Sequence, residues 1–358
     1  MTSNTLFTPC RLGALELPNR VLMAPLTRSR AGAGNVPSDL AVTYYTQRAS
    51  AGLIISEATQ VVPEGQGYPT TPGIHSEDQV AGWKRVTDAV HKAGGRMVLQ
   101  LWHVGRVSHP VYQPGSKLPV APSAIAPKGQ LYGPDWKKID YVAPRALNLA
   151  ELPGIVAGYV KGAKNAKQAG FDGVEVHGAN GYLLDEFLRD GSNTRTDRYG
   201  GSLENRARLL IEVVAAVVEV WGASRVGVRL SPLNPNNDMA DSNPRATFGF
   251  AARALAHFGL AWVHVLEPFD TPPETEVLST IKRACNSPVI ANNGYTLATA
   301  EAAIAAGRAD AIAFGKLFLA NPDLPTRLRT GAALNAWDMK TFYGGGAAGY
   351  TDYPALPA

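Results

Sequence analysis

The chain has 358 residues, of which 45% are hydrophobic and 18% charged, a composition typical of a globular protein with a large core. Its formal net charge of +4 comes from interspersed acidic and basic residues without a Lys/Arg block, so we expect no nucleic-acid partner. The two cysteines, Cys10 and Cys285, are too few for a disulfide framework or a cysteine metal cluster.

The sequence predicts neither an export signal nor a membrane span. Residues 1–11 lack the apolar run of a signal peptide, and no run of about twenty apolar residues follows. Together with the low cysteine content, this pattern predicts a cytoplasmic protein.

Short apolar runs alternate with amphipathic stretches along the chain. In chain order, the predicted strands are 21–24, 53–57, 97–101, 173–176, 226–230, 262–265, 288–291 and 311–314. The predicted helices are 78–93, 153–169, 205–220, 245–258, 297–306 and 322–329. This alternation is typical of parallel strands that are buried on both faces. We predict an α/β fold, a single (β/α)8 TIM barrel over 1–358, with a long Pro-, Gly- and Ser-rich loop at 103–150 after the third strand.

A doubly wound sheet with a dinucleotide site is the main alternative fold. It requires G-x-G-x-x-G directly after the first strand. Here Pro25-Leu26-Thr27 follows that strand, and Gly32-Ala33-Gly34 has no third glycine in register. The sequence therefore favours the barrel.

Chemistry in such a barrel lies at the C-terminal ends of the strands, where several polar residues stand. Thr27 and Gln100 can hydrogen-bond a flat heteroaromatic ring, and a buried Arg229 needs an anionic partner. Turns with Asn293-Gly294 and Gly315-Lys316 follow the last two strands, where barrels commonly bind phosphate. A phosphate site beside a site for a planar polar ring indicates FMN.

Each of these residues also has a purely structural interpretation. Arg229 could pair with Glu57 or Glu267, and Gln100 could be a satisfied polar residue of the upper barrel layer. Lys316 could be a solvated lysine at a helix start. Their shared position at one end of the barrel favours the functional interpretation.

The segment that runs from His177 to Tyr182 follows the fourth strand. His177 and Asn180 stand three residues apart, so one helical turn would place both on one side. Two neutral donors aimed at one point can hold a carbonyl or nitro oxygen, and Tyr182 offers a phenolic proton. A capped helix start with a core tyrosine is the structural alternative. We expect His264 to be structural and, because His103 and His109 lack matching carboxylates, no metal site.

Over about 7–354, the sequence resembles the Old Yellow Enzyme family of FMN-dependent ene-reductases. The stretches that carry the resemblance are Ala24-Pro25-Leu26-Thr27-Arg28, 100–106, 170–182, 195–206, Ala313-Phe314-Gly315-Lys316, 321–324, 342–346 and 349–354. Thr27 stands where another branch of the family has cysteine, which suggests the yeast-type and enterobacterial branch. The chain lacks the cysteine set that the iron–sulfur dienoyl-CoA reductase relatives need.

The resemblance implies a role for each matching residue. It implies that noncovalent FMN is held by Ala24, Pro25, Leu26, Thr27, Ala58, Gln100, His177, Arg229, Asn293, Gly294, Gly315 and Lys316. His177 and Asn180 would bind the substrate oxygen, and Tyr182 would protonate the substrate. Tyr68, Trp102 and Tyr350 would line the substrate pocket.

The reaction that the resemblance implies has two half-reactions. NADPH or NADH gives a hydride to flavin N5, and the hydride then passes to the β-carbon of an activated alkene such as an α,β-unsaturated carbonyl or a nitroalkene. Reduction of nitrate esters or nitro compounds at the same site is the alternative activity. A flavin- or phosphate-binding barrel without turnover is disfavoured by the presence of His177, Asn180 and Tyr182. A metal-dependent barrel hydrolase would need His and Asp ligands at several strand ends, which the sequence does not supply. The resemblance implies a monomer or a homodimer.

The sequence departs from the family at three points. Lys316 stands where many relatives have arginine, which keeps the charge but loses the bidentate fork. The stretch 266–276 after the sixth strand is shorter than in many relatives, which would open the pocket. Ala348 stands where an acidic residue is common.

Overall fold

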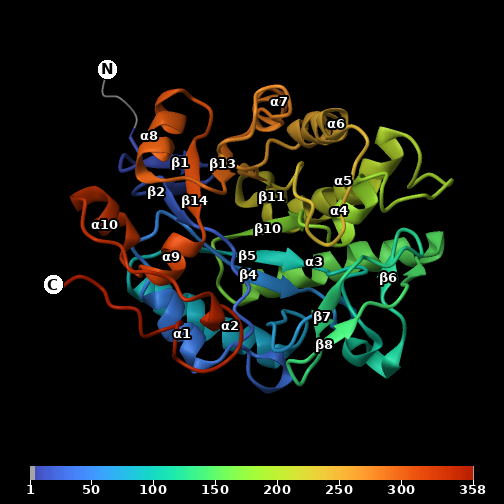
Figure 1. Cartoon of the computed structure of the whole chain (residues 1–358), viewed down its shortest axis with the longest axis horizontal. Helices are drawn as coiled ribbons and strands as arrows, with labels where there is room; N and C mark the ends of the chain where they lie inside the picture. The colour runs from blue at the N-terminus through green and yellow to red at the C-terminus, as the bar shows by residue number, and fades with distance from the viewer. Residues whose placement is uncertain (1–4, 358) are drawn as a thin grey trace.

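The fold is a closed barrel of eight parallel strands, seen in a computed structural model that describes residues 5–357 (Figure 1). The barrel strands are β3 (Val21–Met23), β4 (Ile54–Gln60), β5 (Met97–Trp102), β10 (Gly173–Gly178), β11 (Val226–Leu230), β12 (Trp262–Leu266), β13 (Val289–Asn292) and β14 (Ala311–Phe314). They pair in chain order, and β14 closes the barrel against β3. The barrel prediction is confirmed, and each predicted strand overlaps an observed one.

Helices fill the connections between the strands and cover the barrel. They are α1 (Asp39–Thr46), α2 (Glu77–Lys92), α3 (Leu152–Gln168), α4 (Leu183–Leu188), α5 (Leu203–Trp221), α6 (Pro244–Ala256), α7 (Leu278–Ala284), α8 (Leu297–Ala305), α9 (Lys316–Ala320) and α10 (Leu324–Thr330). The sequence did not predict α1, α4, α7 and α9, whose lengths of five to eight residues are too short for a clear helical period. The helix predicted at 322–329 starts later, because Asp323 lies outside helical geometry.

Local signals set the ends of the longer helices. At the start of α2, the Ser76 hydroxyl accepts from the backbone N–H of Gln79, and the Gln79 side chain accepts from the backbone N–H of Ser76. This capping box satisfies two N–H groups that have no partner within the helix. Trp83 on α2 is fully buried, so the helix is held by an apolar face as well as by its cap.

A small hairpin closes the N-terminal end of the barrel. Strands β1 (Cys10–Leu12) and β2 (Leu15–Leu17) pair antiparallel, and their leucines pack against Trp262 and other side chains of the barrel interior. At the turn, Gly13 has a φ of +57°, and a Cβ there would lie 2.2 Å from the backbone oxygen of Ser224. Within residues 5–357, this hairpin covers the N-terminal end of the barrel, so a ligand would enter from the opposite end.

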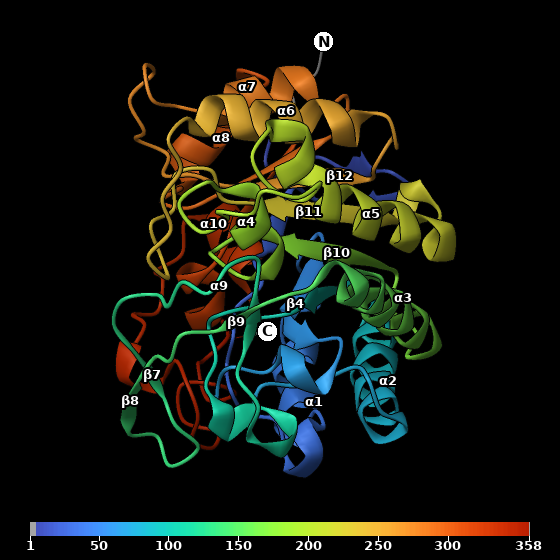
Figure 2. The ribbon, with the colours of Figure 1, turned by 90° about the vertical axis from the view of Figure 1, so that its right-hand side faces the viewer.

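The loop over 103–150 contains short strands and, as predicted, no long helix. Strands β6 (Val120–Ala121) and β9 (Arg145–Ala146) pair parallel, and β7 (Gln130–Tyr132) and β8 (Lys138–Asp140) form a hairpin that projects from the molecule (Figure 2). Trp136 at the turn of this hairpin packs so closely on Gly344 that a Cβ at Gly344 would lie 2.5 Å from its ring. The loop therefore contacts the C-terminal segment. No helix in the described part of the chain has both the length and the apolar character to cross a membrane.

Candidate active site

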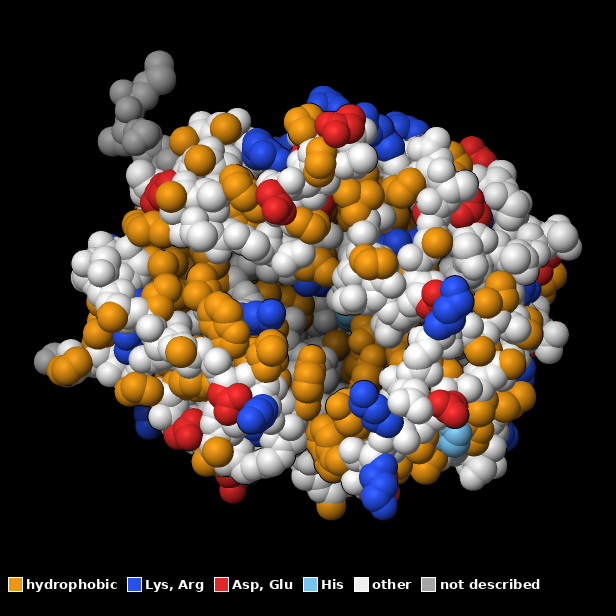
Figure 3. All heavy atoms as spheres, in the orientation of Figure 1, with side chains coloured by type: hydrophobic (Ala, Val, Ile, Leu, Met, Phe, Trp, Pro, Cys, Tyr) orange, Lys and Arg blue, Asp and Glu red, His pale blue; other side chains and the backbone are white. Residues whose placement is uncertain are grey.

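A cavity of about 1040 Å³ opens at the C-terminal ends of the barrel strands, near the centre of the face shown in Figure 3. This is the end at which barrels of this class carry their sites. Predicted site residues that line it are Ala24, Pro25, Leu26, Thr27, Tyr68, Asn180, Tyr182, Arg229, Asn293, Gly294, Gly315 and Lys316. Residues from five strand ends and from the loop after β4 thus meet at one place.

Three predicted site residues lie directly behind the cavity wall. Trp102 is fully buried, and its ring centroid lies 5.8 Å from that of Tyr68 and 5.0 Å from that of Tyr182. Ala58 belongs to the same apolar cluster. His177 is buried with its ring centroid 5.1 Å from that of Tyr182. These residues support the cavity-lining tyrosines, and Trp102 is not itself part of the wall.

The placement of Tyr350 corrects the sequence interpretation. Tyr350 is fully buried and its ring stacks on Tyr44 at 4.2 Å, with the guanidinium of Arg28 4.9 Å from its centroid. It does not line the cavity. Tyr343, seven positions earlier in the same glycine-rich segment, does line it and is 56% exposed. Both tyrosines follow motif residues, and the sequence offered no signal to choose between them.

The chain between His177 and Asn180 does not form the helical turn that their spacing predicted. His177 lies within β10, whereas Asn180 has a φ of +61° in the turn that follows. Gly181 continues the turn at +75°, and a Cβ there would lie 2.5 Å from the Met239 side chain. A left-handed turn, which asparagine and glycine tolerate best, therefore carries the chain from the strand to Tyr182.

The hydroxyl groups of Tyr182 and Tyr68 lie 3.1 Å apart and form a hydrogen bond. Burial raises the pKa of the Tyr182 phenol well above its ordinary value, and the pKa of Tyr68 in the same way. Both phenols therefore stay protonated near neutral pH. A protonated Tyr182 at the cavity wall can act as a general acid.

His177 is a neutral imidazole near neutral pH. Burial, together with the nearby charge of Arg229, lowers its pKa to about 3. Its Nδ1 atom is buried and finds no partner in the described part of the chain. A neutral imidazole carries one N–H donor and adds no charge to the site.

Arg229 is held by a buried polar network at the floor of the cavity. It donates to the Asn292 Oδ1 at 2.8 Å and to the ring of His264, whose Nδ1 lies 3.0 Å from a Glu175 oxygen. Burial opposes the ionisation of Glu175, but His264, Arg229 and Trp262 outweigh it and lower its pKa to about 2. The Nε atom of Arg229 is buried without a partner in the residues described. The arginine thus keeps a donor available at the cavity.

The purely structural interpretation is wrong for Arg229 but agrees with the position of Gln100. Glu57 accepts from the backbone N–H of Arg28, and Glu267 accepts from that of Val277, so neither pairs with Arg229. Gln100, in contrast, donates to Glu175 at 2.8 Å and does not line the cavity. His264, expected to be structural, is part of the network that holds Arg229.

The turns after β13 and β14 form the other end of the cavity. Asn293 has a φ of +103° and Gly294 a φ of +80°, and both line the cavity with Gly315. Lys316, the first residue of α9, is exposed and has no carboxylate partner among residues 5–357. This end combines tight backbone turns with one available cation, which suits a phosphate group.

Sequence reasoning missed a set of residues that come from two loops. Leu233, Asn234, Asn237, Phe342 and Tyr343 line the cavity. Asn234, Asn236 and Asn237 come directly after β11, and this cluster of asparagines behind a strand end was an available signal. The C-terminal pair is placed by Arg28, which donates from Nε to the backbone oxygen of Phe342 at 2.9 Å.

Comparison with known proteins agrees with this geometry. Residues 5–335 match the model of the NADH:flavin oxidoreductase / NADH oxidase family. The chain belongs to this family. It is accordingly an enzyme, a flavin oxidoreductase.

Individual relatives match over nearly the whole length. The putative 12-oxophytodienoate reductase 2 of Oryza sativa is 46% identical, over 98% of this chain and 94% of its own. A structure of morphinone reductase in complex with tetrahydroNAD superposes with a TM-score of 0.95 at 50% identity, covering 99% of this chain and 98% of that one. The old yellow enzyme homologue from Zymomonas mobilis also has a TM-score of 0.95, at 44% identity over 99% and 100% of the two chains. These relatives place the chain within the Old Yellow Enzyme group.

Proposed function

We propose that this enzyme is an FMN-dependent ene-reductase that uses NADPH or NADH to reduce activated alkenes such as α,β-unsaturated carbonyls and nitroalkenes. One observation carries the proposal. Asn180 and the protonated Tyr182 line a single cavity beside Arg229, with the neutral His177 directly behind Tyr182. Oxygen-binding donors, an acid and a buried cation together suit an acceptor that gains negative charge on oxygen.

The residues present fit FMN. The buried Arg229 has a free Nε donor and no direct carboxylate partner, so it can accommodate an electron-rich ring edge. Thr27 lines the same cavity as Arg229, while Gly294, Gly315 and Lys316 would hold the phosphate. When bound, FMN would supply the hydride transfer between the nicotinamide and the alkene. Ala58 and Gln100 would act from behind the wall, since neither lines the cavity.

The oxygen of the acceptor would be bound by Asn180, which lines the cavity, and by His177, which lies behind Tyr182. Both donors are neutral, so they add no net charge to the site. Their hydrogen bonds become stronger as negative charge develops on the oxygen. These bonds therefore lower the activation free energy of the reduction. Removal of one such donor typically slows a reaction about a hundredfold.

Tyr182 would deliver a proton to the α-carbon of the acceptor. Its phenol is protonated near neutral pH and is fixed by the Tyr68 hydroxyl at 3.1 Å. Tyr68 would help to orient this phenol and would also form part of the acceptor pocket with Tyr343. Trp102 would support both tyrosines through its buried ring.

The relatives support the proposal in two respects. Their names specify reductases, and one solved structure of morphinone reductase contains a reduced nicotinamide analogue, tetrahydroNAD. Use of NADPH or NADH as the reductant stays a prediction. The cytoplasmic location, the monomer or homodimer, the single-domain assignment and the branch inferred from Thr27 also stay predictions. Nitro compounds and nitrate esters offer similar oxygens to Asn180, so their reduction is the second activity to test.

The experiment is to identify the bound cofactor and follow its oxidation state. Acid precipitation should release FMN, NADPH or NADH should bleach the flavin absorbance under anaerobic conditions, and 2-cyclohexenone should restore it with formation of cyclohexanone. Release of FAD, or no flavin binding after reconstitution, would contradict the cofactor assignment. Restoration by a nitrate ester but not by any enone or nitroalkene would favour the second activity.

A further inference from the structure

The side chain of Asn180 ends in an amide whose oxygen and nitrogen have nearly the same shape. Only the nitrogen end can donate a hydrogen bond to a ligand oxygen in the cavity that Asn180 lines. If the oxygen end faced the cavity, it would repel a carbonyl, nitro or phenolate oxygen. The orientation of this amide therefore decides whether Asn180 can bind such a ligand.

Two hydrogen bonds determine the orientation of the Asn180 amide. The donor of the first is a backbone N–H, so the direction of that bond is certain. The backbone N–H of Asn236, which can only donate, binds the Oδ1 of Asn234 at 2.9 Å. The other end of the Asn234 amide is then its Nδ2, which donates to the Oδ1 of Asn180 at 2.9 Å. The Asn180 oxygen is thus occupied, and its Nδ2 has no partner among residues 5–357.

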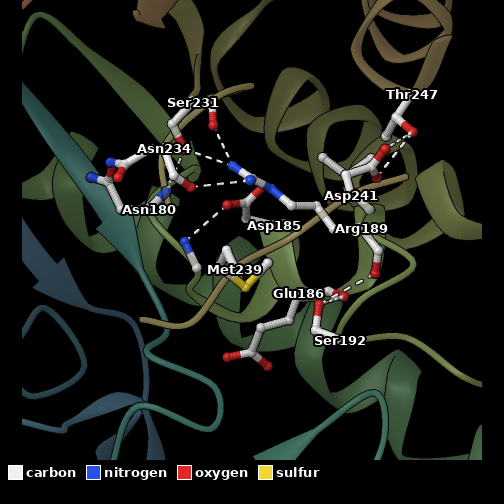
Figure 4. A network of polar contacts seen from close by, with 12 residues as sticks. Asn180, Asp185, Glu186, Arg189, Ser192, Ser231, Asn234, Met239, Asp241 and Thr247 are labelled. Atoms are coloured by element: carbon white, nitrogen blue, oxygen red, sulfur yellow. Dashed lines mark hydrogen bonds and ion pairs between the residues drawn. The ribbon is translucent and has the colours of Figure 1, made fainter. Parts of the chain in front are cut away.

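The backbone of Asn180 is held as firmly as its side chain. Its N–H donates to the Ser231 Oγ at 2.7 Å (Figure 4), and its carbonyl oxygen accepts from the Asn237 side chain at 2.7 Å. With both backbone groups bound, rotation of the amide is the freedom that remains. Asn234 is the residue that restricts it.

A buried ion pair fixes the loop of Asn234 to the turn of Asn180. Arg189 and Asp185 pair at 3.0 Å, with side chains 2% and 0% exposed. Arg189 donates to the backbone oxygens of Asn234 and Ser231, and Asp185 accepts from the backbone N–H of Gly181 at 2.8 Å (Figure 4). The two segments are therefore held in one register from the protein interior.

We propose that Asn234 is a positioning residue that keeps the donor end of the Asn180 amide turned toward the cavity. The inference rests on the proposed function, because it supposes a ligand with an acceptor oxygen. Asn234 acts through Asn180 and sets the polarity of the oxygen site. A direct contact between Asn234 and the ligand is the competing explanation, since Asn234 also lines the cavity.

The first test is the isosteric variant Asn234→Asp, read by calorimetric titration of the FMN-loaded protein with phenol. The variant keeps the oxygen that accepts from Asn236 but replaces the donor that faces Asn180 with an acceptor. The Asn180 amide should then turn over, and the Kd of phenol should rise about a hundredfold, as in Asn180→Ala. Asn234→Ala, which frees the amide without inverting it, should raise the Kd by roughly tenfold. An unchanged Kd in both variants would overturn the proposal.

A second variant distinguishes the orientation of the Asn180 amide from repulsion between the new carboxylate and the ligand. Asn236→Asp places the same negative charge on the same loop, but its side chain makes no hydrogen bond to Asn180. It should raise the Kd much less than Asn234→Asp does. Equal effects of the two variants would show that charge alone is responsible and would overturn the polarity argument.

A double-variant comparison separates positioning from direct contact. If Asn234 acts only through Asn180, Asn234→Ala should change the Kd less than twofold once Asn180→Ala is present. The same loss in both backgrounds would mean that Asn234 binds the ligand directly, and the proposal would be wrong. Flavin content and the thermal midpoint of each variant show whether it is folded.

These outcomes are distinct from failure of the proposed function. A wild-type protein that binds phenol but reduces no alkene would contradict the proposed activity and leave the positioning result intact. A wild-type protein that binds FMN but no phenol would overturn both.

Discussion

Arg229 and Glu175 are opposite charges within the barrel that do not touch, because the imidazole of His264 lies between them. Arg229 donates to the Nε2 of His264, and the Nδ1 of that ring lies 3.0 Å from the Glu175 carboxylate. Burial, followed by the charge of Arg229, lowers the pKa of His264 to about 4, so the connecting ring is neutral. The arrangement compensates the charge of Arg229, which lines the cavity and whose Nε atom has no partner among residues 5–357.

This relationship predicts the effect of Glu175→Gln. The substitution preserves shape but removes the anion that compensates Arg229, and an uncompensated buried charge costs roughly 3 kcal/mol or more. Denaturant unfolding should show a loss of this size. The control is Glu219→Gln on the exposed surface of α5, which should change stability by no more than about 0.5 kcal/mol. Equal stability losses in the two variants would contradict the compensation of Arg229 by Glu175.

The pKa of His177 predicts a pH dependence with a definite sign. Its native pKa of about 3 lies below the unfolded value of about 6.5, so below pH 6.5 the unfolded chain binds a proton that the native site excludes. The contribution of His177 to stability is therefore complete above pH 6.5 and is lost as the pH falls toward 3. Relative to His177→Asn, wild type should lose up to about 1.4 kcal/mol per pH unit between pH 6 and 4.5. If the free energies of unfolding of wild type and His177→Asn changed with pH in parallel, His177 would not be a neutral imidazole in the native protein.

Ligand binding offers a second view of the same group. Because His177 stays neutral, affinity for a neutral acceptor such as 2-cyclohexenone should be constant from pH 5 to pH 8. A step in affinity near pH 6.5 that disappears in His177→Asn would show that the imidazole titrates in the native protein.

Tyr182→Phe tests proton delivery separately from binding. The variant should be reduced by NADPH or NADH at nearly the wild-type rate, because the phenol is needed only at the alkene. Enone reduction should fall about a hundredfold or more. With a nitroalkene, stopped-flow traces should still show flavin reoxidation while unprotonated nitronate is released. Enone turnover at the wild-type rate would mean that the proton comes from elsewhere.

The different placements of Tyr343 and Tyr350 predict opposite phenotypes. Tyr350→Ala removes a fully buried ring from its stack on Tyr44 and should lower the free energy of unfolding by about 3–5 kcal/mol. Tyr343→Ala, at the exposed cavity wall, should barely change stability but should alter KM for bulky enones. Thermal unfolding and steady-state kinetics measure the two effects. A stability loss in Tyr343→Ala equal to that in Tyr350→Ala would contradict these placements.

The barrel was predictable because its signals are local and repeated. A buried strand such as Val226–Leu230 is an uninterrupted apolar run apart from Arg229, and the longer helices carry caps and a regular apolar face. Short helices such as α4 contain too few residues to show a period. Their positions are set by tertiary contacts, as where Arg189, just beyond α4, donates to the backbone oxygen of Asn234.

The candidate site was predictable where residues follow strand ends and unpredictable where partners come from distant segments. Tyr182 and Lys316 are adjacent to strands, so the barrel itself brings them to one rim. The bond between Asn234 and Asn180 joins residues 54 positions apart, and the local pattern around each gives no sign of it. The burial of Tyr350 likewise depends on Tyr44, far away in the sequence.

The most direct test of the central claim follows the two hydrogens that the alkene gains. A 2-methyl-substituted cyclohexenone is reduced in ordinary water with nicotinamide that carries deuterium at the transferable position, and the product is analysed by NMR. The account predicts deuterium at the β-carbon, protium from solvent at the α-carbon and an intact carbonyl group. Deuterium at the α-carbon, or reduction of the carbonyl to an alcohol, would contradict it.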